Sequence, residues 1–425
     1  MLVKKLFPLV FVALLFSCNN DKVTHTKDYS AYLGTEIDQT ELMADVDFWT
    51  KKLEATPNQF PYLVKRAGAH SEVFDTTGDI SHLIAAEKDL IAANEATNYD
   101  KAGYLKALAS NYISQHRFQE ALELLKKAEE NGENLKGTKK MLFDVHLELG
   151  NYIYAKSYLD EVKNTSDFDY LIRLAKWEDH QGNLEGAIEN MEKATAIAES
   201  SNLKPTKIWA YTNLADFYGH DGQIKKSYEH YLKALELDPD NAYAKKGIAW
   251  IVYSYEKNPE AALVILDDIN TYYYAPDYDL LKADIADYMG DQSLKSKSLE
   301  SYRNHVENEH YGDMYNKYNV LLYTDAMVNV DEALAIAQKE VNNRPTPESY
   351  DLLAWSVYKK GNAKQALEIL EKNVIGHTSE PDVLYHIAEI YKANGVKDKV
   401  APLKEELLSS LYELGPTMDA QIKAL

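Results

Sequence analysis

A stripe of aromatic and charged side chains lies between residues 243 and 253. Tyr243, Lys246, Trp250 and Tyr253 are three, four and three positions apart, so they share one face of a helix. Aromatic area beside fixed charges is the chemistry with which proteins hold a peptide or a sugar ring. The alternative is that these rings pack against neighbouring helices, as aromatic stripes commonly do. The stripe indicates a binding surface rather than a reaction centre.

Other polar residues do not assemble into a catalytic or metal-binding pattern. A His-Asp-Gly sequence at 220–222 falls in a predicted turn, where polar residues are common. Residues 238–241 begin like a calcium loop, but Ala242 stands where an oxygen ligand is needed. Two histidines and a glutamate within 305–310 lack the HExxH spacing of zinc proteases. We therefore expect no enzyme activity, no metal ion and no cofactor.

The single cysteine, Cys18, ends an apolar amino-terminal stretch. Two lysines precede the run LFPLVFVALLF, which is too short to span a bilayer. The context LLFSC resembles the lipobox of bacterial lipoproteins, with Leu15 three positions before the cysteine and Ser17 directly before it. Phe16 is bulkier than that motif usually has. An ordinary signal peptide that ends near a cysteine is the alternative.

The lipoprotein resemblance implies a processed and anchored protein. Residues 1–17 would be a signal peptide, and Cys18 would become the lipidated first residue, holding the chain on a membrane without crossing it. By analogy Asn19 points to the outer membrane of a bacterial cell envelope. Because the only cysteine would carry lipid, no disulfide would form within the chain.

The chain is strongly acidic. It has 46 basic and 67 acidic residues, a net charge of −21, and loss of the signal peptide removes two lysines and leaves −23. Such a surface repels phosphate backbones and anionic lipid headgroups. Nucleic acid is therefore excluded as a partner, while a basic or neutral protein is compatible.

The elements that position the stripe are paired helices. In 208–241, Tyr211, Leu214 and Tyr218 fall on one side of a first helix. Gly222 then ends the first helix at a turn, and a second helix runs to Pro239. Small residues at 215 and 227 allow the two helices to cross closely.

Similar hairpins recur along the chain. Gly361 and Gly395 are thirty-four residues apart, and Gly150 and Gly182 are thirty-two apart, with helical periodicity on both sides of each. The order of large, small and aromatic residues in 208–241 and this period resemble the tetratricopeptide repeat (TPR). The resemblance implies an all-α, right-handed α-solenoid of about ten helical hairpins, because one hairpin cannot bury its own apolar face.

The predicted domain plan follows from this period. We expect a polar, lipidated tether at 18–38, a capping helix or half repeat at 39–57, the repeat array at 58–415 and a carboxy-terminal cap at 416–425. The seventh and eighth hairpins, at about 276–346, carry a weak glycine signal.

The TPR resemblance also implies where a ligand would bind. In TPR proteins the first helix of each hairpin lines a concave face, and the stripe at 243–253 lies on such a helix. The candidate groove residues on the first helices are Trp209, Asp216, Tyr243, Lys246, Trp250, Tyr253, Asp284, Asp287, Asp351, Trp355 and Tyr358. The basic and asparagine set with which one TPR subfamily grips a peptide carboxylate is not reproduced, since Ile172 and Thr212 stand at two of its positions.

These observations predict a membrane-anchored scaffold that binds a protein or peptide in its concave groove. One alternative is a glycan-binding lipoprotein of a nutrient-uptake system. Starch-uptake lipoproteins also use TPR hairpins but interrupt them with long insertions, which this chain lacks. A second alternative is an assembly scaffold without a groove ligand.

Overall fold

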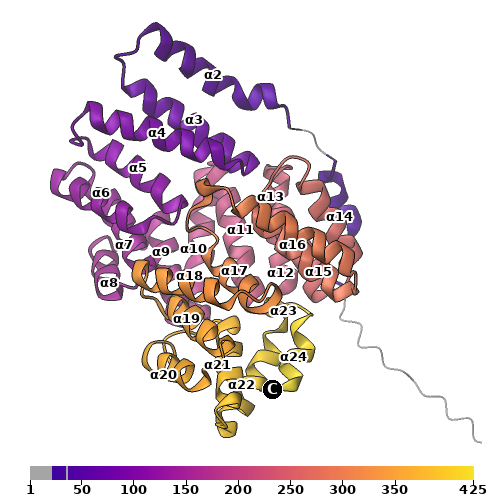
Figure 1. Ribbon diagram of the computed structural model, residues 1–425. Coiled ribbons are helices and arrows are strands. Elements are labelled where there is room, and N and C mark those ends of the chain that lie inside the picture. The colour runs from indigo at the N-terminus through magenta and orange to yellow at the C-terminus, as the bar shows by residue number, and fades with distance from the viewer. Residues whose placement is uncertain (1–21, 35–36) are drawn as a thin grey trace, which may run out of the picture.

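The computed structural model describes residues 22–34 and 37–425, and every regular element within them is a helix. Ten helical hairpins follow one another between residues 61 and 409, and each packs on the next (Figure 1). Stacking joins their apolar faces into a continuous core. The predicted all-α solenoid of about ten hairpins is confirmed.

We number the hairpins 1 to 10 in chain order. Their first helices are α3 (Pro61–Thr77), α5 (Ala102–Ser114), α7 (Leu135–Glu148), α9 (Phe168–His180), α11 (Lys204–His220), α13 (Ala242–Trp250) with η2 (Ile251–Tyr255), α15 (Pro276–Met289), α17 (Asn316–Leu321) with η4 (Leu322–Ala326), α19 (Pro347–Lys359) and α21 (Pro381–Ala393). Their second helices are α4 (Ile80–Ala96), α6 (Phe118–Asn131), α8 (Tyr152–Glu161), α10 (Leu184–Ser201), α12 (Ile224–Leu237), α14 (Pro259–Ile269), α16 (Gln292–Val306), α18 (Val330–Asn343), α20 (Ala363–Asn373) and α22 (Lys397–Ser409). A short helix, η3 (Glu309–Tyr311), joins hairpins 7 and 8.

The hairpins form for the reasons that the sequence suggested. Ala215 and Ser227 have no exposed surface where α11 crosses α12, as close helix packing requires. The five turn glycines all adopt positive φ: Gly150, Gly182, Gly222, Gly361 and Gly395. Hairpin 8, which has no turn glycine, instead uses Val328 at φ 45°. In hairpins 6 and 8 the first helix ends in a wider π turn, η2 or η4.

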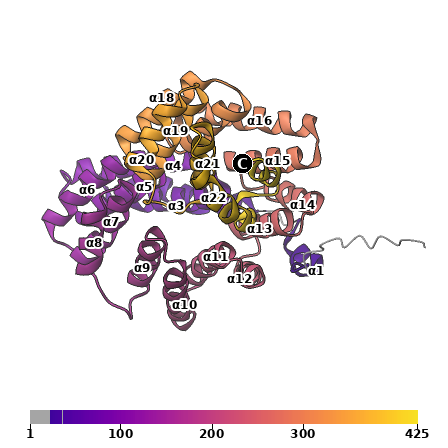
Figure 2. The same cartoon turned by 90° about the horizontal axis from the view of Figure 1, so that it is seen from below.

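The superhelix closes on itself. Seen end on in Figure 2, the chain passes once around and returns over its own beginning. The Tyr274 backbone N–H donates to the Thr77 carbonyl at 2.8 Å. Arg344 lies 3.4 Å from Glu148, 196 residues away in sequence. Successive turns of the superhelix are therefore in contact, and the hollow inside it is bounded by both.

Further helices pack on both ends of the array. Helix α2 (Gln39–Ala55) packs on α3. Helix α24 (Met418–Ala424) packs on α22, where Ile422 and Leu407 are fully buried with Ala388. Helix α23 (Leu411–Leu414) lies between α22 and α24 in the chain and turns inward to contact α11 and η2.

Part of the predicted tether is folded onto the array. Within 18–38, residues 22–34 form α1 (Thr26–Tyr29) and η1 (Ser30–Tyr32). The Glu256 carboxylate accepts hydrogen bonds from the Thr24 backbone N–H at 2.6 Å and its hydroxyl at 2.9 Å, and Tyr29 is buried. The polar composition concealed this docking because its anchors are hydrogen bonds to hairpin 6 and one tyrosine.

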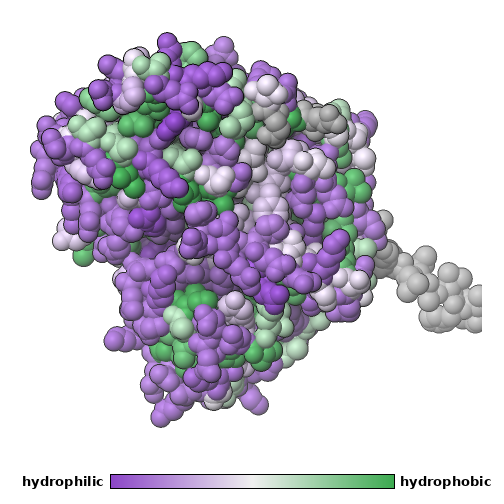
Figure 3. Space-filling view, turned by 45° about the horizontal axis from the view of Figure 1, so that its top comes forward, coloured by the Kyte–Doolittle hydropathy of each residue, from purple (hydrophilic) through white to green (hydrophobic). Residues whose placement is uncertain are grey.

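The surface of the molecule is mostly hydrophilic, with small and scattered apolar patches on the face that Figure 3 shows. The apolar residues lie instead between the helices, in clusters that follow the array. Across the part of the chain that the structure describes, no helix combines the length and apolar character that crossing a bilayer requires.

Candidate functional site

The first helices of hairpins 5, 6 and 7 present their predicted groove residues to one another. Tyr243 on α13 donates a hydrogen bond to the Asp216 carboxylate of α11 at 2.6 Å. In η2, which continues α13, Tyr253 donates to the Asp284 carboxylate of α15 at 2.7 Å. Trp250 lies between them, with its ring 5.8 Å from that of Tyr253. Neighbouring repeats therefore hold these side chains in place through tyrosine–carboxylate hydrogen bonds.

A segment from the carboxy-terminal end of the chain crosses this face. We call residues 411–417 the inner segment; it consists of α23 and the three residues after it. Ser254, in the π turn η2, donates to the Tyr412 carbonyl oxygen at 2.6 Å. Thr417 donates its hydroxyl hydrogen to Asp284 at 2.8 Å. At the other end His220 Nδ1 lies 2.6 Å from the Glu413 carboxylate.

Gly415 brings the backbone of the inner segment close to the groove. Its φ is +83°, which favours glycine. A Cβ added there would lie 3.3 Å from the Trp250 ring and 3.4 Å from the Asp284 carboxylate. The glycine lets the chain turn against the tryptophan, and a larger residue would force the segment outward.

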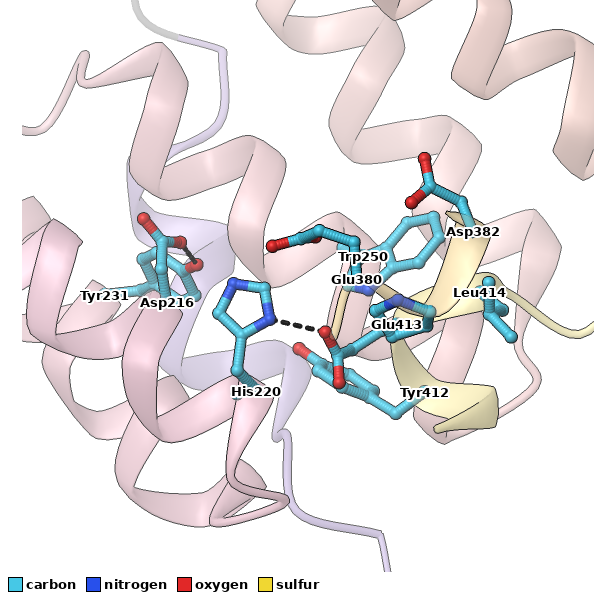
Figure 4. Close-up of a pocket in the computed structure, with 11 residues that line it drawn as sticks. Asp216, His220, Tyr231, Trp250, Glu380, Asp382, Tyr412, Glu413 and Leu414 are labelled. Carbon is cyan, nitrogen blue, oxygen red and sulfur yellow. Dashed lines mark hydrogen bonds and ion pairs between the residues drawn. The ribbon is translucent and has the colours of Figure 1, made fainter. Parts of the chain in front are cut away.

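A cavity of about 290 Å³ remains beside the inner segment. Figure 4 shows its side chains converging from α11, α12, α13, the start of α21 and α23. The lining residues are Asp216, Gly219, His220, Tyr231, Trp250, Glu380, Pro381, Asp382, Tyr412, Glu413 and Leu414.

The cavity is acidic and aromatic. Burial raises the pKa of Asp216, although hydroxyl donors partly oppose this. The Glu380 side chain faces the hollow, with protein around it. Burial raises the pKa of its carboxyl, and the nearby carboxylate of Asp382 raises it further. Asp382 pairs with Lys317 at 2.7 Å, and this lysine lowers the Asp382 pKa in spite of burial. The cavity therefore gathers carboxyl groups next to the Trp250 ring. A cationic group bound there would favour their charged form and lie against the ring, so the arrangement suits a cation.

Raising the pH is expected to loosen the inner segment. The hydrogen bond to Glu413 raises the pKa of His220 above its usual value, burial opposes this, and Asp216 and Asp179 add to the rise. The stabilisation from this contact is complete below about pH 6.5, the usual histidine pKa, and is lost as the pH rises through the folded-state pKa. Because His220 is half exposed, the effect is at most about 1 kcal/mol.

Amide hydrogen exchange of the inner segment, corrected for the intrinsic pH dependence of exchange, measures this effect. Opening should increase with pH in the natural chain and become flat in His220→Gln. Glu380 also faces His220, so Glu380→Gln should shift the midpoint downward. The exposed His310 serves as the control, and His310→Gln should behave as the natural chain. An unchanged pH profile in His220→Gln would contradict the assignment.

The structure brings some of the predicted groove residues together. Asp216, Trp250 and Asp284 contact the inner segment or line its cavity, and Tyr243 supports Asp216 from a half-exposed position. Lys246 is engaged within the fold, where it lies 2.5 Å from the Asp277 carboxylate.

Other predicted residues lie elsewhere. Tyr253, Asp351 and Trp355 are 0%, 2% and 3% exposed, so they belong to the packing between repeats and present almost no surface to a ligand. This corrects their placement on the groove surface, and the alternative of packing against neighbouring helices accounts for them. The remaining three lie apart from the inner segment: Trp209 packs edge-on against Phe168, Asp287 pairs with Lys295, and Tyr358 faces Glu389.

Sequence reasoning missed the inner segment and its contacts. The 220–222 turn was noted only as an unpromising catalytic motif, whereas His220 binds Glu413. The Gly-Pro pair at 415–416 was a signal for a sharp turn between the array and its cap. Nothing in the local pattern indicated that this turn reaches hairpin 6.

Two further predictions concern residues or groups that the structure does not test. Cys18 and the predicted signal peptide lie outside the described residues. Within residues 22–34 and 37–425, no group of three or more histidine, cysteine or acidic side chains is close enough to hold a metal ion.

Comparison with known families matches the centre of this site. The family model described as tetratricopeptide repeat matches residues 210–241, which cover most of α11 and all of α12. Residues 210–241 are a tetratricopeptide repeat. The TPR match covers hairpin 5, which carries Asp216 and His220. No curated protein sequence matches the chain.

Several solved structures are similar in fold to this chain. The human IFIT1 dimer with m7Gppp-AAAA is 13% identical to this chain and has a TM-score of 0.46. The match covers 77% of this chain and 76% of the IFIT1 chain. A tetratricopeptide repeat protein from Parabacteroides merdae is 16% identical over 61% of this chain and 97% of its own, with a TM-score of 0.34. Yeast Tom70 is 15% identical over 90% and 86%, with a TM-score of 0.36. None of these similarities assigns a ligand to this chain.

Proposed function

We propose that this chain is a TPR interaction scaffold that binds a segment of a partner protein on the concave face of hairpins 5 to 7. The observation that carries the proposal is that this face already holds the inner segment of the chain itself. The face binds it through a hydroxyl donor, a carboxylate acceptor, a histidine and a tryptophan ring. These are the groups with which a groove recognises a peptide.

The cavity beside the inner segment supports a partner that also carries a basic residue, next to the segment that occupies the groove. Asp216 and Glu380 face it without a cation at ion-pair distance, and Trp250 offers a ring face. A lysine or arginine side chain would gain both Coulomb and cation–π attraction there. No catalytic role is proposed for this protein.

The proposal includes anchoring at Cys18 in a bacterial envelope, at the outer membrane. The lipobox-like sequence LLFSC supports it. Residues 22–34 are docked on hairpin 6, so only three residues would separate the lipidated cysteine from the folded body. The solenoid would then lie close to the membrane, with α1 and α14 nearest to it. Radiolabelled palmitate should label the natural chain and not Cys18→Ser; equal labelling would contradict the anchor.

Trp250→Ala tests the groove. Crosslinking in intact cells, followed by gentle solubilisation and purification of the chain, should recover a partner with the natural chain. Recovery should fall at least about tenfold with Trp250→Ala, because a central aromatic residue in such a contact contributes about 2 kcal/mol or more. Trp177→Ala, on the separate helix α9, is the matched control and should recover the partner fully. Equal recovery with both variants would refute binding at this face.

A second recess favours glycan binding as the other candidate function. It has a volume of about 650 Å³ and lies between hairpins 3 and 4 on one side and the loop that joins hairpins 9 and 10 on the other. Trp177, Tyr152 and His180 form its aromatic wall, with the two latter rings 4.2 Å apart. Gln181 and Ser379 add polar groups. Aromatic rings with convergent polar groups suit a sugar ring.

The same two tryptophan variants separate the candidates. Oligosaccharides should quench tryptophan fluorescence in the natural chain and in Trp250→Ala, but not in Trp177→Ala. The absence of quenching by any oligosaccharide in the natural chain would exclude the second candidate and leave the first in place.

A further inference from the structure

The inner segment is a candidate for an exchangeable ligand of the groove rather than a fixed part of the core. Most of its residues are only half-buried, whereas the helices that it crosses carry fully buried side chains. Its contacts with the groove are two hydrogen bonds, the His220–Glu413 contact, the approach of Gly415 and the packing of the Tyr412 ring on Gly219. A half-buried segment held largely by such contacts opens at a lower free-energy cost than a fully buried helix.

The cap of the array can stay in place when the segment moves. Helix α24 packs directly on α22, through the fully buried Ile422 and Leu407. Helix α23 has only four residues, too few for independent helical stability. Its position therefore depends on the contacts with hairpins 5 to 7 and on Leu411 and Leu414, which pack against hairpin 10 and α24.

We propose that the inner segment is an internal competitor for the groove, and that the partner segment which displaces it presents the same chemistry. That chemistry is an aromatic residue, an acidic residue, an aliphatic residue, a Gly-Pro turn and a hydroxyl, in the order found in Tyr412–Thr417. This inference rests on the proposed function of the face. A tethered segment competes at an effective concentration of about the millimolar range, so the groove of the free protein would be self-occupied.

The chain itself supplies the probe. A fluorescent peptide of residues 409–420, SSLYELGPTMDA, is titrated against the full-length protein and followed by anisotropy. In Gly415→Val the new side chain meets Trp250 and Asp284, which expels the tethered segment and leaves the groove residues unchanged. The variant should bind the peptide at least about tenfold more tightly than the natural chain, because the tethered competitor is removed.

Gly395→Val is the matched control. This glycine also has positive φ, but a Cβ there would meet nothing within 4 Å, so the variant also strains the backbone at a turn but does not touch the groove. Its peptide affinity should equal that of the natural chain. Thr417→Val, which removes only the hydrogen bond to Asp284, is a second and milder variant and should tighten binding about threefold.

The outcomes are distinct. Equal peptide affinity in the natural chain, Gly415→Val, Thr417→Val and Gly395→Val would overturn the inference, and so would failure of the peptide to bind any of them. If the partner capture of the proposed function depended on Trp250 while the peptide failed to bind, only the competitor would be refuted. If the peptide bound as expected and no Trp250-dependent partner were recovered, the self-occupied groove would stand and the scaffold function would fall.

Discussion

Replacing Lys245 with methionine is expected to reduce the stability of hairpin 6 by about 3–5 kcal/mol, the usual cost of breaking a buried ion pair. The side chain of Lys245 is 1% exposed, and its ammonium lies 3.0 Å from the Asp268 carboxylate. The same ammonium lies 4.9 Å from the Tyr272 ring centre. Without the lysine, Asp268 keeps the backbone N–H of Gly34 as a donor but loses its cation. Native-state hydrogen exchange in α13 and α14 measures the loss locally, which suits a repeat array.

Two variants control this prediction. Lys225→Met removes an exposed lysine 3.9 Å from Glu229, and should change stability by less than about 0.5 kcal/mol. The double change Lys245→Met with Asp268→Leu should recover much of the loss, because the uncompensated carboxylate is removed as well. If Lys245→Met exchanged as slowly as the natural chain, the buried pair would not hold the hairpin together.

Lys245 and Lys246 show what the sequence could predict. Helical periodicity placed Lys246 on the face of Trp250, and it does lie on the exposed side, at Asp277. The adjacent Lys245 falls on the packing face, a position that the same periodicity gives to apolar residues. The pattern gave no sign that a lysine there would be buried, because its partner Asp268 comes from the next helix and Tyr272 from the following turn.

The helical hairpins were predictable because their signals are local. Turn glycines, small residues at 215 and 227, and the spacing of apolar residues all act within one hairpin. Closure of the superhelix was not predictable in this way. It depends on contacts such as His220 with Glu413, which are 193 residues apart, and on the small rotation between repeats that accumulates along the array.

This accumulated rotation also determines which residues lie at the candidate site. The sequence predicted an open groove lined by aromatic residues. In the structure the return of the chain brings Tyr412 and Gly415 to that groove and buries Tyr253 beneath it. When a concave surface is predicted from the repeat pattern alone, its free area is therefore known only once the path of the chain ends is known.

Replacing Asp351 with alanine is expected to lower the stability of hairpins 9 and 10 by about 3–5 kcal/mol, since it leaves a buried histidine without its partner. Asp351 on α19 lies 2.7 Å from His386 Nδ1 on α21, and both side chains are almost fully buried. Trp355 stacks on the His386 ring at 4.0 Å. The pair joins the first helices of two successive hairpins, so its loss should loosen their interface. Hydrogen exchange in α19 and α21 measures the change.

The same pair makes this interface pH-dependent. Burial disfavours a charged His386, but the attraction of Asp351 outweighs it and raises the His386 pKa. The stabilisation is complete below about pH 6.5 and is lost as the pH rises through the folded-state pKa. Asp351→Asn removes the largest attraction, while Asp382 and Asp325 still oppose burial, so the slope of stability against pH should flatten. The exposed His377 provides the control, since His377→Gln should keep the natural slope. A natural slope in Asp351→Asn would show that His386 is uncharged in the folded protein, and the interface would then depend on packing against Trp355 instead of on an ion pair.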